Sequence, residues 1–424
     1  MHLSRWAARL VCASALLVSP SLTQHAFAQT LSLRSALQRA LAANPRLTVA
    51  ERDVGIASGQ SAQARALPNP ELSYEHDNAF GSGPYRGTRA AESTVQISQL
   101  VELFGKREAR IAAGRAALDA AAMQRQAVRL EVLSETAIAF LSVLGAQNRI
   151  RILDEQVAAL SQLTPLLKRR VEAGASSPAE TGRAEVAADL VKADRARAGA
   201  ALASARRELA ILMGDTAPRF AAVSGRLEAT GQPPPFNTVV AAIDANPQLA
   251  RWTAIHAQRN AELMMARLKP YPDVRVSAGW RHYNETGDNA VRLGISVPLP
   301  LFDDNSGNIA AARENVGKVR AERAAGRATL IAVAGRAYDS VQGALRELAV
   351  LRGSAIPKAR QAGEAIRDGF AQGRFSLLEV LDAEATLAQA RLREQEALQN
   401  FHVAVATIEG LIGNPFTLAR ERGR

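Results

Sequence analysis

The sequence repeats its own plan at an offset of roughly two hundred residues, and this duplication constrains the fold more than any other feature. Two proline-containing motifs recur 202 residues further on, and two glycine-containing marks recur 199 residues further on. The matched pairs are Asn44-Pro45 with Asn246-Pro247, Pro68-Asn69-Pro70 with Pro270-Tyr271-Pro272, Gly174 with Gly373, and Met213-Gly214 with Ile412-Gly413. Such an elongated plan is rarely duplicated in enzymes. It predicts one structure built from two equivalent repeats, residues 29–226 and 227–424.

The first 28 residues are interpreted as a secretory signal peptide. Arg5 and Arg9 precede a mostly apolar run, and Ala26-Phe27-Ala28 provides a cleavage site of the A-x-A type. The apolar run is much shorter than the ~20 residues that a membrane-spanning helix needs. The only cysteine, Cys12, lies in this segment, so the mature chain is predicted to contain no disulfide and no catalytic or metal-binding thiol.

Each repeat contains a long stretch with apolar residues spaced three and four apart, which is typical of helices that pack as coiled coils. We predict helical hairpins over about residues 105–213 and 308–413. The apolar series that define them include Leu130, Leu133, Ala137, Phe140 and Leu144 in the first repeat and Leu398, Phe401, Val405, Ile408 and Ile412 in the second.

Each repeat also contains two segments in which apolar and polar residues alternate, as in strands that bury one face. We predict strands at about residues 71–80 and 92–101, and at about 273–283 and 290–299. Their lengths of roughly 9–11 residues match tilted strands that cross a membrane. Half-buried hairpins of a soluble domain are the alternative, but an exported chain offers these apolar faces no other cover. Four strands cannot close a barrel, so membrane strands would require a dimer with eight strands or a trimer with twelve.

The charge of the chain does not indicate a nucleic-acid partner. The formal net charge is +11, but the basic residues are mixed with acidic ones and form no dense block, and aromatic residues make up only 4% of the sequence. The six histidines lack metal-binding spacing, and we interpret His76 and His282 as exposed strand residues rather than metal ligands. The sequence contains no candidate catalytic group, and we expect no cofactor and no metal site.

The sequence resembles a known family, the TolC-like outer-membrane efflux channels, and within that family the heavy-metal, CzcC-like branch. The resemblance covers essentially the whole mature chain. The segments that carry it are Leu31 to Leu37 with Ala43-Asn44-Pro45, Leu67 to Leu72, Ile97 to Arg107, Pro298 to Phe302 and Gly369 to Ala383. Within the third segment, Glu102-Leu103-Phe104-Gly105-Lys106-Arg107 is the element associated with the metal branch.

The resemblance implies a mostly helical fold with membrane strands, assembled as a homotrimer. Twelve strands would form one transmembrane β-barrel in the outer membrane, in contact with its lipid, and the helical hairpins would form a periplasmic α-barrel. The chain would be the passive exit duct for divalent heavy-metal cations of the cobalt, zinc and cadmium class. It would dock on a periplasmic membrane-fusion adaptor and an inner-membrane pump of the resistance–nodulation–division (RND) type.

The resemblance also suggests where such a duct would narrow and dock. Glu379 and Asp382 lie three residues apart, so they share one helix face. In the family the matching positions form the periplasmic aperture. An ordinary solvated acidic pair, or an ion pair with Arg374, is the alternative. The turns at Gly174 and Ala175 and at Gly373 and Arg374 would be the adaptor-docking tips, although plain hairpin turns explain the glycines equally well.

Two other functions remain open from the sequence. The same channel could serve drug efflux or type I protein secretion, and a periplasmic coiled-coil scaffold without a pore would also use long helical hairpins. The sequence does not identify the exported substrate.

Overall fold

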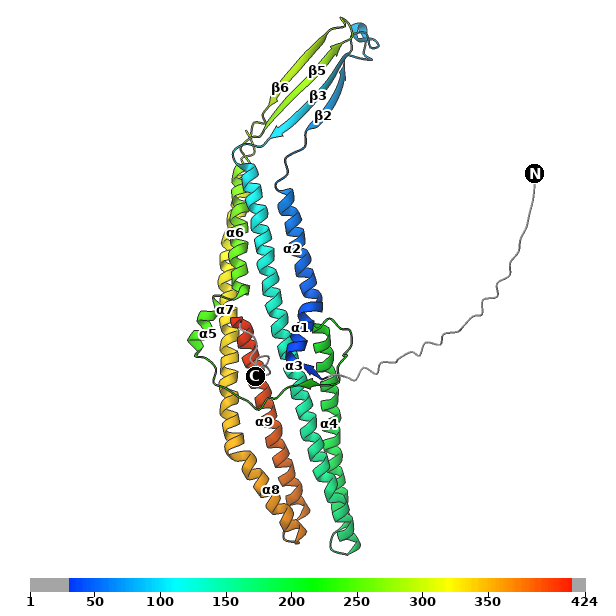
Figure 1. Ribbon diagram of the computed structural model, residues 1–424, viewed down its shortest axis with the longest axis vertical. Coiled ribbons are helices and arrows are strands. Elements are labelled where there is room, and N and C mark those ends of the chain that lie inside the picture. Colours follow the sequence, from blue (N-terminus) through cyan, green and yellow to red (C-terminus); the bar gives the residue numbers. More distant parts are fainter. Residues whose placement is uncertain (1–29, 414–424) are drawn as a thin grey trace, which may run out of the picture.

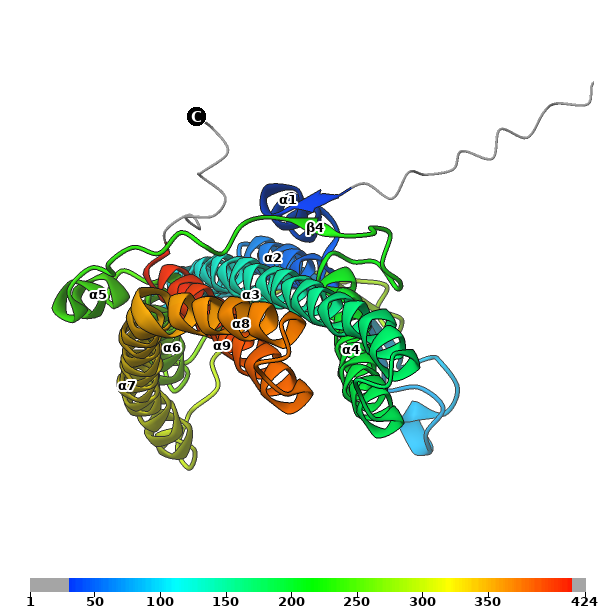
Figure 2. The same ribbon diagram turned by 90° about the horizontal axis from the view of Figure 1, so that it is seen from below.

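The computed structural model describes residues 30–413, so the predicted signal peptide lies outside the described residues. The molecule is elongated, with a β-sheet at one end and two helical hairpin tips at the other (Figure 1). Seen along the long axis, the helices lie side by side in a curved layer, with α1, β4 and α5 along one side (Figure 2). The predicted fold class, mostly helical with a small sheet and long helical hairpins, is confirmed.

The same order of elements occurs in both repeats. In chain order the elements are β1 (Leu31–Ser32), α1 (Leu33–Ala43), α2 (Pro45–Gln63), β2 (Glu71–Asp77), a 3₁₀ turn (Gly83–Tyr85), β3 (Glu92–Val101), α3 (Lys106–Glu172), α4 (Pro178–Leu212), β4 (Val223–Ser224), α5 (Phe236–Ile243), α6 (Pro247–Leu268), β5 (Val274–Tyr283), β6 (Asn289–Ser296), α7 (Ser306–Val350), a π-helical turn (Leu351–Ala355), α8 (Ile356–Ala371) and α9 (Leu377–Ile412). The short α1 and α5 precede α2 and α6, the strands follow, and a long hairpin ends each repeat.

Helix α3 is the central element of the helical layer. It has 67 residues, so at 1.5 Å per residue it is about 100 Å long, and it contacts α2, α4, α6 and α9. Its predicted apolar stripe is buried where these helices meet: Ala137, Phe140 and Leu144 belong to one core cluster, together with residues of α1, α4 and α9. Within residues 30–413, no helix is both long enough and apolar enough to cross a membrane.

The four long strands form one antiparallel sheet in the order β2-β3-β5-β6, so β2 and β6 are open edges. The register places apolar side chains in rows on one face of the sheet. These rows are Leu72, Ile97, Ala278 and Leu293, and then Tyr74, Val95, Trp280 and Val291. Most of these large side chains are exposed in the single chain. One face of the sheet is therefore apolar and is not covered by any other part of the described chain.

Three predicted elements differ from the structure. The first strand ends at Asp77 rather than at residue 80, because Asn78 and Phe80 adopt positive φ angles. The last strand ends at Ser296, because Pro298 and Pro300 have no N–H to donate to a neighbouring strand. The outgoing helix of the second repeat is not continuous, since the π-helical turn Leu351–Ala355 separates α7 from α8.

The two repeats are joined by a segment that returns to the start of the described chain. Strands β1 and β4 pair in parallel, with Leu31 opposite Val223. Residues 225–235 then lead to α5 and the second repeat. The start of repeat one is therefore held beside its own end.

Candidate functional site

The two hairpin tips lie at the end of the molecule opposite the sheet, where the sequence predicts them (Figure 1). Gly174 and Gly373 have φ angles of +72° and +73°, a conformation that glycine adopts without the strain a side chain would cause. Ala175 and Arg374 follow them and are exposed. The turns therefore present small and polar groups to solvent, and next to Arg374 the second tip also exposes Phe375 and Leu378.

The two tips are tied to each other. Arg170, near the end of α3, donates from Nη1 to the carbonyl oxygen of Phe370 at 3.0 Å, and its guanidinium lies 4.8 Å from the centre of the Phe370 ring. Phe370 is buried, so this contact connects repeat one to the core of the second tip. Movement of either tip relative to the other has to break it.

Glu379 has a structural role that the sequence analysis missed. Its Oε2 accepts from the Ser376 backbone N–H at 2.7 Å and from the Ser376 hydroxyl at 2.8 Å. The Ser376 hydroxyl in turn accepts from the Glu379 N–H, which completes a capping box at the start of α9. The bond from the Ser376 backbone N–H, followed by that from its hydroxyl, lowers the pKa of Glu379. The pattern Ser-x-x-Glu was the signal that could have revealed this cap.

Asp382 lies one turn further along α9, is exposed, and has no ion-pair partner among the described residues. Arg374 donates to the side chain of Gln372, so the alternative ion pair between Arg374 and the acidic pair is not formed. In repeat one, Glu180 accepts from the Ser176 hydroxyl. Arg183 occupies the position of repeat one that is equivalent to Asp382 in repeat two. The acidic residue that distinguishes the second tip is therefore Asp382.

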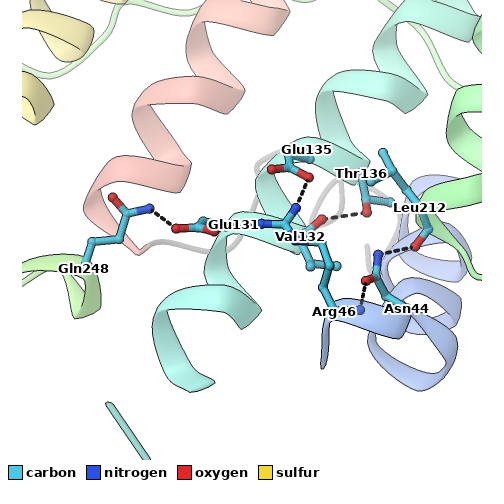
Figure 3. Close-up of polar contacts among 8 residues, drawn as sticks. All are labelled: Asn44, Arg46, Glu131, Val132, Glu135, Thr136, Leu212 and Gln248. Atoms are coloured by element: carbon cyan, nitrogen blue, oxygen red, sulfur yellow. Dashed lines mark hydrogen bonds and ion pairs between the residues drawn. The ribbon is translucent and has the colours of Figure 1, made fainter. Parts of the chain in front are cut away.

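The repeated Asn-Pro motifs form two equivalent joints between helices. Asn44 caps α2 by accepting from the Arg46 N–H at 2.9 Å, and its amide donates to the Leu212 carbonyl at the end of α4 at 2.8 Å (Figure 3). Asn246 caps α6 by accepting from the Gln248 N–H at 2.7 Å, and donates to the Leu411 carbonyl at the end of α9. Both asparagines are buried. Each joint thus fixes the start of one helix to the end of another.

Glu131 on α3 connects the two joints. It accepts from Nη2 of Arg46 at 2.8 Å and from Nε2 of Gln248 at 3.0 Å (Figure 3). Arg46 and Gln248 are equivalent residues, each two positions after its asparagine. Arg46 also donates to Glu135 at 2.6 Å, and this bond is the main cause of the raised pKa of Arg46. One carboxylate on α3 therefore contacts the residue that follows the helix start in each repeat.

The histidines singled out by the sequence lie on separate strands. His76 is hydrogen bonded to Ser93 at 2.9 Å, and His282 to Asn289 at 3.0 Å. Within residues 30–413, no three His, Cys, Asp or Glu side chains are grouped as they would be around a metal ion.

The sequence profile of the family described as "Outer membrane efflux protein" matches residues 36–215 and 238–414, one segment in each repeat. The chain is 32% identical over 383 residues to the cobalt-zinc-cadmium resistance protein CzcC of Cupriavidus metallidurans, covering 90% of each chain. It is 28% identical to the nickel-cobalt-cadmium resistance protein NccC of Alcaligenes xylosoxydans over 67% of this chain and 64% of that protein. A crystal structure of CusC shares the fold, with a TM-score of 0.75 at 17% identity over 90% of this chain and 92% of that one. The chain belongs to the outer membrane efflux protein family.

Proposed function

We propose that this chain is the outer-membrane component of a tripartite RND-type efflux system, and that it is the passive exit duct for divalent heavy-metal cations of the cobalt, zinc and cadmium class. The observation that carries the proposal is the 32% identity to a cobalt-zinc-cadmium resistance protein over 90% of both chains. The duct extends from the outer membrane into the periplasm and does no chemistry of its own.

The open sheet requires assembly with further copies, and the TolC-like fold favours a homotrimer over an eight-stranded dimer. Unpaired backbone groups at an edge in lipid have no water to bind, so β2 and β6 both need a partner. Three chains supply twelve strands, an even number within the range of membrane barrels, and β6 of each chain meets β2 of the next. The exposed apolar face of the sheet then contacts outer-membrane lipid, and the curved helical layers form the periplasmic tunnel.

The tips are assigned to docking on the periplasmic adaptor, which links the duct to the inner-membrane pump. Gly174 and Ala175 contribute from one hairpin, and Gly373 and Arg374 from the other. Their exposure and their distance from the sheet support this assignment.

Deletion of the gene in the host is expected to reduce tolerance to cobalt, zinc or cadmium salts, and a plasmid copy should restore it. Growth on a panel of metals and organic drugs is the measurement. Lost drug tolerance with unchanged metal tolerance would identify a drug channel instead. Recovery of the protein in the soluble periplasm, rather than in detergent extracts of the outer membrane, would identify a scaffold without a pore.

The periplasmic aperture is assigned to Glu379 and Asp382. Because Glu379 also caps α9, its replacement should keep a hydrogen-bond acceptor. We expect the Glu379→Gln, Asp382→Asn double variant to raise the single-channel conductance of the closed trimer. Block by Co²⁺ should weaken at least about fivefold, since even one pair of unit charges about 4 Å apart interacts by about 1 kcal/mol in water and the variant removes two charges per chain. Glu180→Gln, at the other tip, is the control. Equal conductance and equal Co²⁺ block in the unmodified protein, the double variant and Glu180→Gln would refute the assignment.

A further inference from the structure

The second face of the sheet carries charges whose sign depends on the repeat. Side chains that alternate with the apolar rows point to this polar face. The charged ones on β2 and β3 are all acidic, and those on β5 and β6 are all basic. They are Glu71, Glu75, Asp77 and Glu92 from repeat one, and Arg275, Arg281 and Arg292 from repeat two.

Every arginine of this set is paired with a carboxylate of the other repeat. Arg275 contacts Glu71 at 2.5 Å, and Arg292 contacts Glu75 at 3.6 Å. These pairs extend across the sheet, because the acidic partners lie on β2 and the arginines lie on β5 and β6. Because repeat one supplies the carboxylates and repeat two supplies the arginines, these ion pairs neutralise most of the charge on the polar face.

Arg281 makes the most extensive of these contacts. Its Nη1 lies 2.7 Å from Glu92 and its Nη2 lies 3.9 Å from Asp77, while its Nε donates to the Thr94 hydroxyl at 2.8 Å. Asp77 and Glu92 are direct cross-strand neighbours. Like charges placed opposite each other destabilise a sheet, so this pair requires a cation, and the Arg281 guanidinium is that cation.

Without Arg281, Asp77 and Glu92 would offer two adjacent carboxylates. Carboxylate oxygens bind divalent metal ions, and paired carboxylates do so more strongly than single ones. A duct that carries such ions conducts only where binding is weak enough for the ion to leave. A carboxylate pair in the wall would hold the cargo.

We propose that Arg281 is a specificity-determining residue that keeps the wall of the duct from retaining the metal cations it exports. Its guanidinium permanently occupies the place of a divalent ion between Asp77 and Glu92. In each chain the acidic strands β2 and β3 lie beside the basic strands β5 and β6, and the ion pairs across the sheet neutralise most of both charges. This proposal rests on the proposed function, because it takes the polar face of the sheet to line the duct.

The test is current through the full-length protein in a planar bilayer, in potassium chloride with added Zn²⁺. Arg281→Gln is expected to introduce block by Zn²⁺ at about tenfold lower concentration than in the unmodified protein, because one positive charge is lost beside two carboxylates. Equilibrium dialysis should show additional Zn²⁺ bound by the variant. Adding Glu92→Gln to Arg281→Gln should return both measurements to the unmodified values.

Arg292→Gln is the matched control. It removes an arginine from the same face, but its partner Glu75 lies opposite Thr94 and has no acidic cross-strand neighbour, so no new block is expected. If Arg281→Gln does not assemble, Arg281→Lys gives a second measurement. An ammonium keeps the charge but lacks the planar fork that reaches both carboxylates, so block should be intermediate. Unchanged block and binding in the assembled Arg281 variants would overturn the inference. Absence of any conductance from the unmodified protein would instead contradict the proposed function.

Discussion

Gly214→Ala is expected to lower the free energy of unfolding by about 3 kcal/mol or more. Gly214 follows α4 with a φ angle of +81°, which costs a side-chain-bearing residue about 1–2 kcal/mol. A Cβ atom at this position would lie 2.3 Å from the Ala43 carbonyl oxygen and 2.8 Å from its carbonyl carbon. Both are backbone atoms next to the Asn44 joint, so no side chain can move aside. Thermal unfolding in detergent and the yield of folded protein measure the loss.

Gly413→Ala is the matched control, because Gly413 occupies the equivalent place after α9. Its φ angle is +70°, and among residues 30–413 a Cβ atom there would meet nothing within 4 Å. The expected cost is therefore only the conformational one, about 1 kcal/mol. If both variants lose a similar free energy of unfolding, the close contact between the new Cβ atom and Ala43 does not contribute to the cost of Gly214→Ala.

A second large effect is expected from a pair of cysteines placed at the proposed seam between chains. Within the chain, β3 pairs with β5 so that Val101 lies opposite Val274. The motif before β5 lies 202 residues after the motif before β2, and α7 begins 200 residues after α3. In the single chain β6 ends at Ser296. If the segment after it becomes extended in the assembly, the same pairing between copies places Leu301 opposite Leu72 of the next chain. In the single chain these two side chains are 74% and 76% exposed.

The Leu72→Cys, Leu301→Cys protein is expected to migrate as a covalent trimer on a non-reducing gel. Residues opposite each other on antiparallel strands have Cα atoms about 4.5–5.5 Å apart, within the range of a disulfide. The only native cysteine is Cys12, in the predicted signal peptide, so no other thiol competes. The measurement is the ratio of trimer to monomer with and without reductant.

Two further cysteine pairs make this result interpretable. Val101→Cys with Val274→Cys should form a bond inside one chain and leave the protein monomeric on the gel. Tyr74→Cys with Leu301→Cys tests a register shifted by two residues and should link poorly. Linking of the shifted pair alone would correct the register. A failure of the uncrosslinked protein to form heat-modifiable trimers would contradict trimeric closure itself.

Most of the secondary structure could be predicted because its signals are local. The coiled-coil spacing around Phe140 predicts α3, and alternation predicts the strands. The π-helical turn Leu351–Ala355 was missed, although Gly353 within it and Pro357 just after it both weaken a continuous α-helix. It coincides with bonds from Arg352 to Glu394 at 2.6 Å and to the Glu228 carbonyl at 3.1 Å. Those contacts join segments that are distant in the sequence.

The sites were predicted less completely, because several of these side chains act over long sequence separations. Asn44 and Asn246 are marked by repetition, and an asparagine before proline predicts the start of a helix. Their bonds to the Leu212 and Leu411 carbonyls depend on how the repeat closes. Glu131 carries no local signal, since only the folded chain brings it to Arg46 and Gln248. Glu379, in contrast, combines an aperture assignment with a cap that its own sequence pattern encodes.

The covalent connection between the repeats, residues 225–235, has a consequence for how the duct comes together. A ring made of single repeats would need six separate bodies to meet, and each association loses translational and rotational freedom worth several kcal/mol. In the proposed trimer, half of the contacts around the ring form inside a chain, where the linker keeps the two partners at a high effective concentration. Three fused chains need only two encounters between molecules, whereas six separate repeats would need five. Fusion also lets the two repeats diverge in sequence. Because each chain carries one acidic and one basic pair of strands, the two kinds alternate around the ring in every assembled trimer.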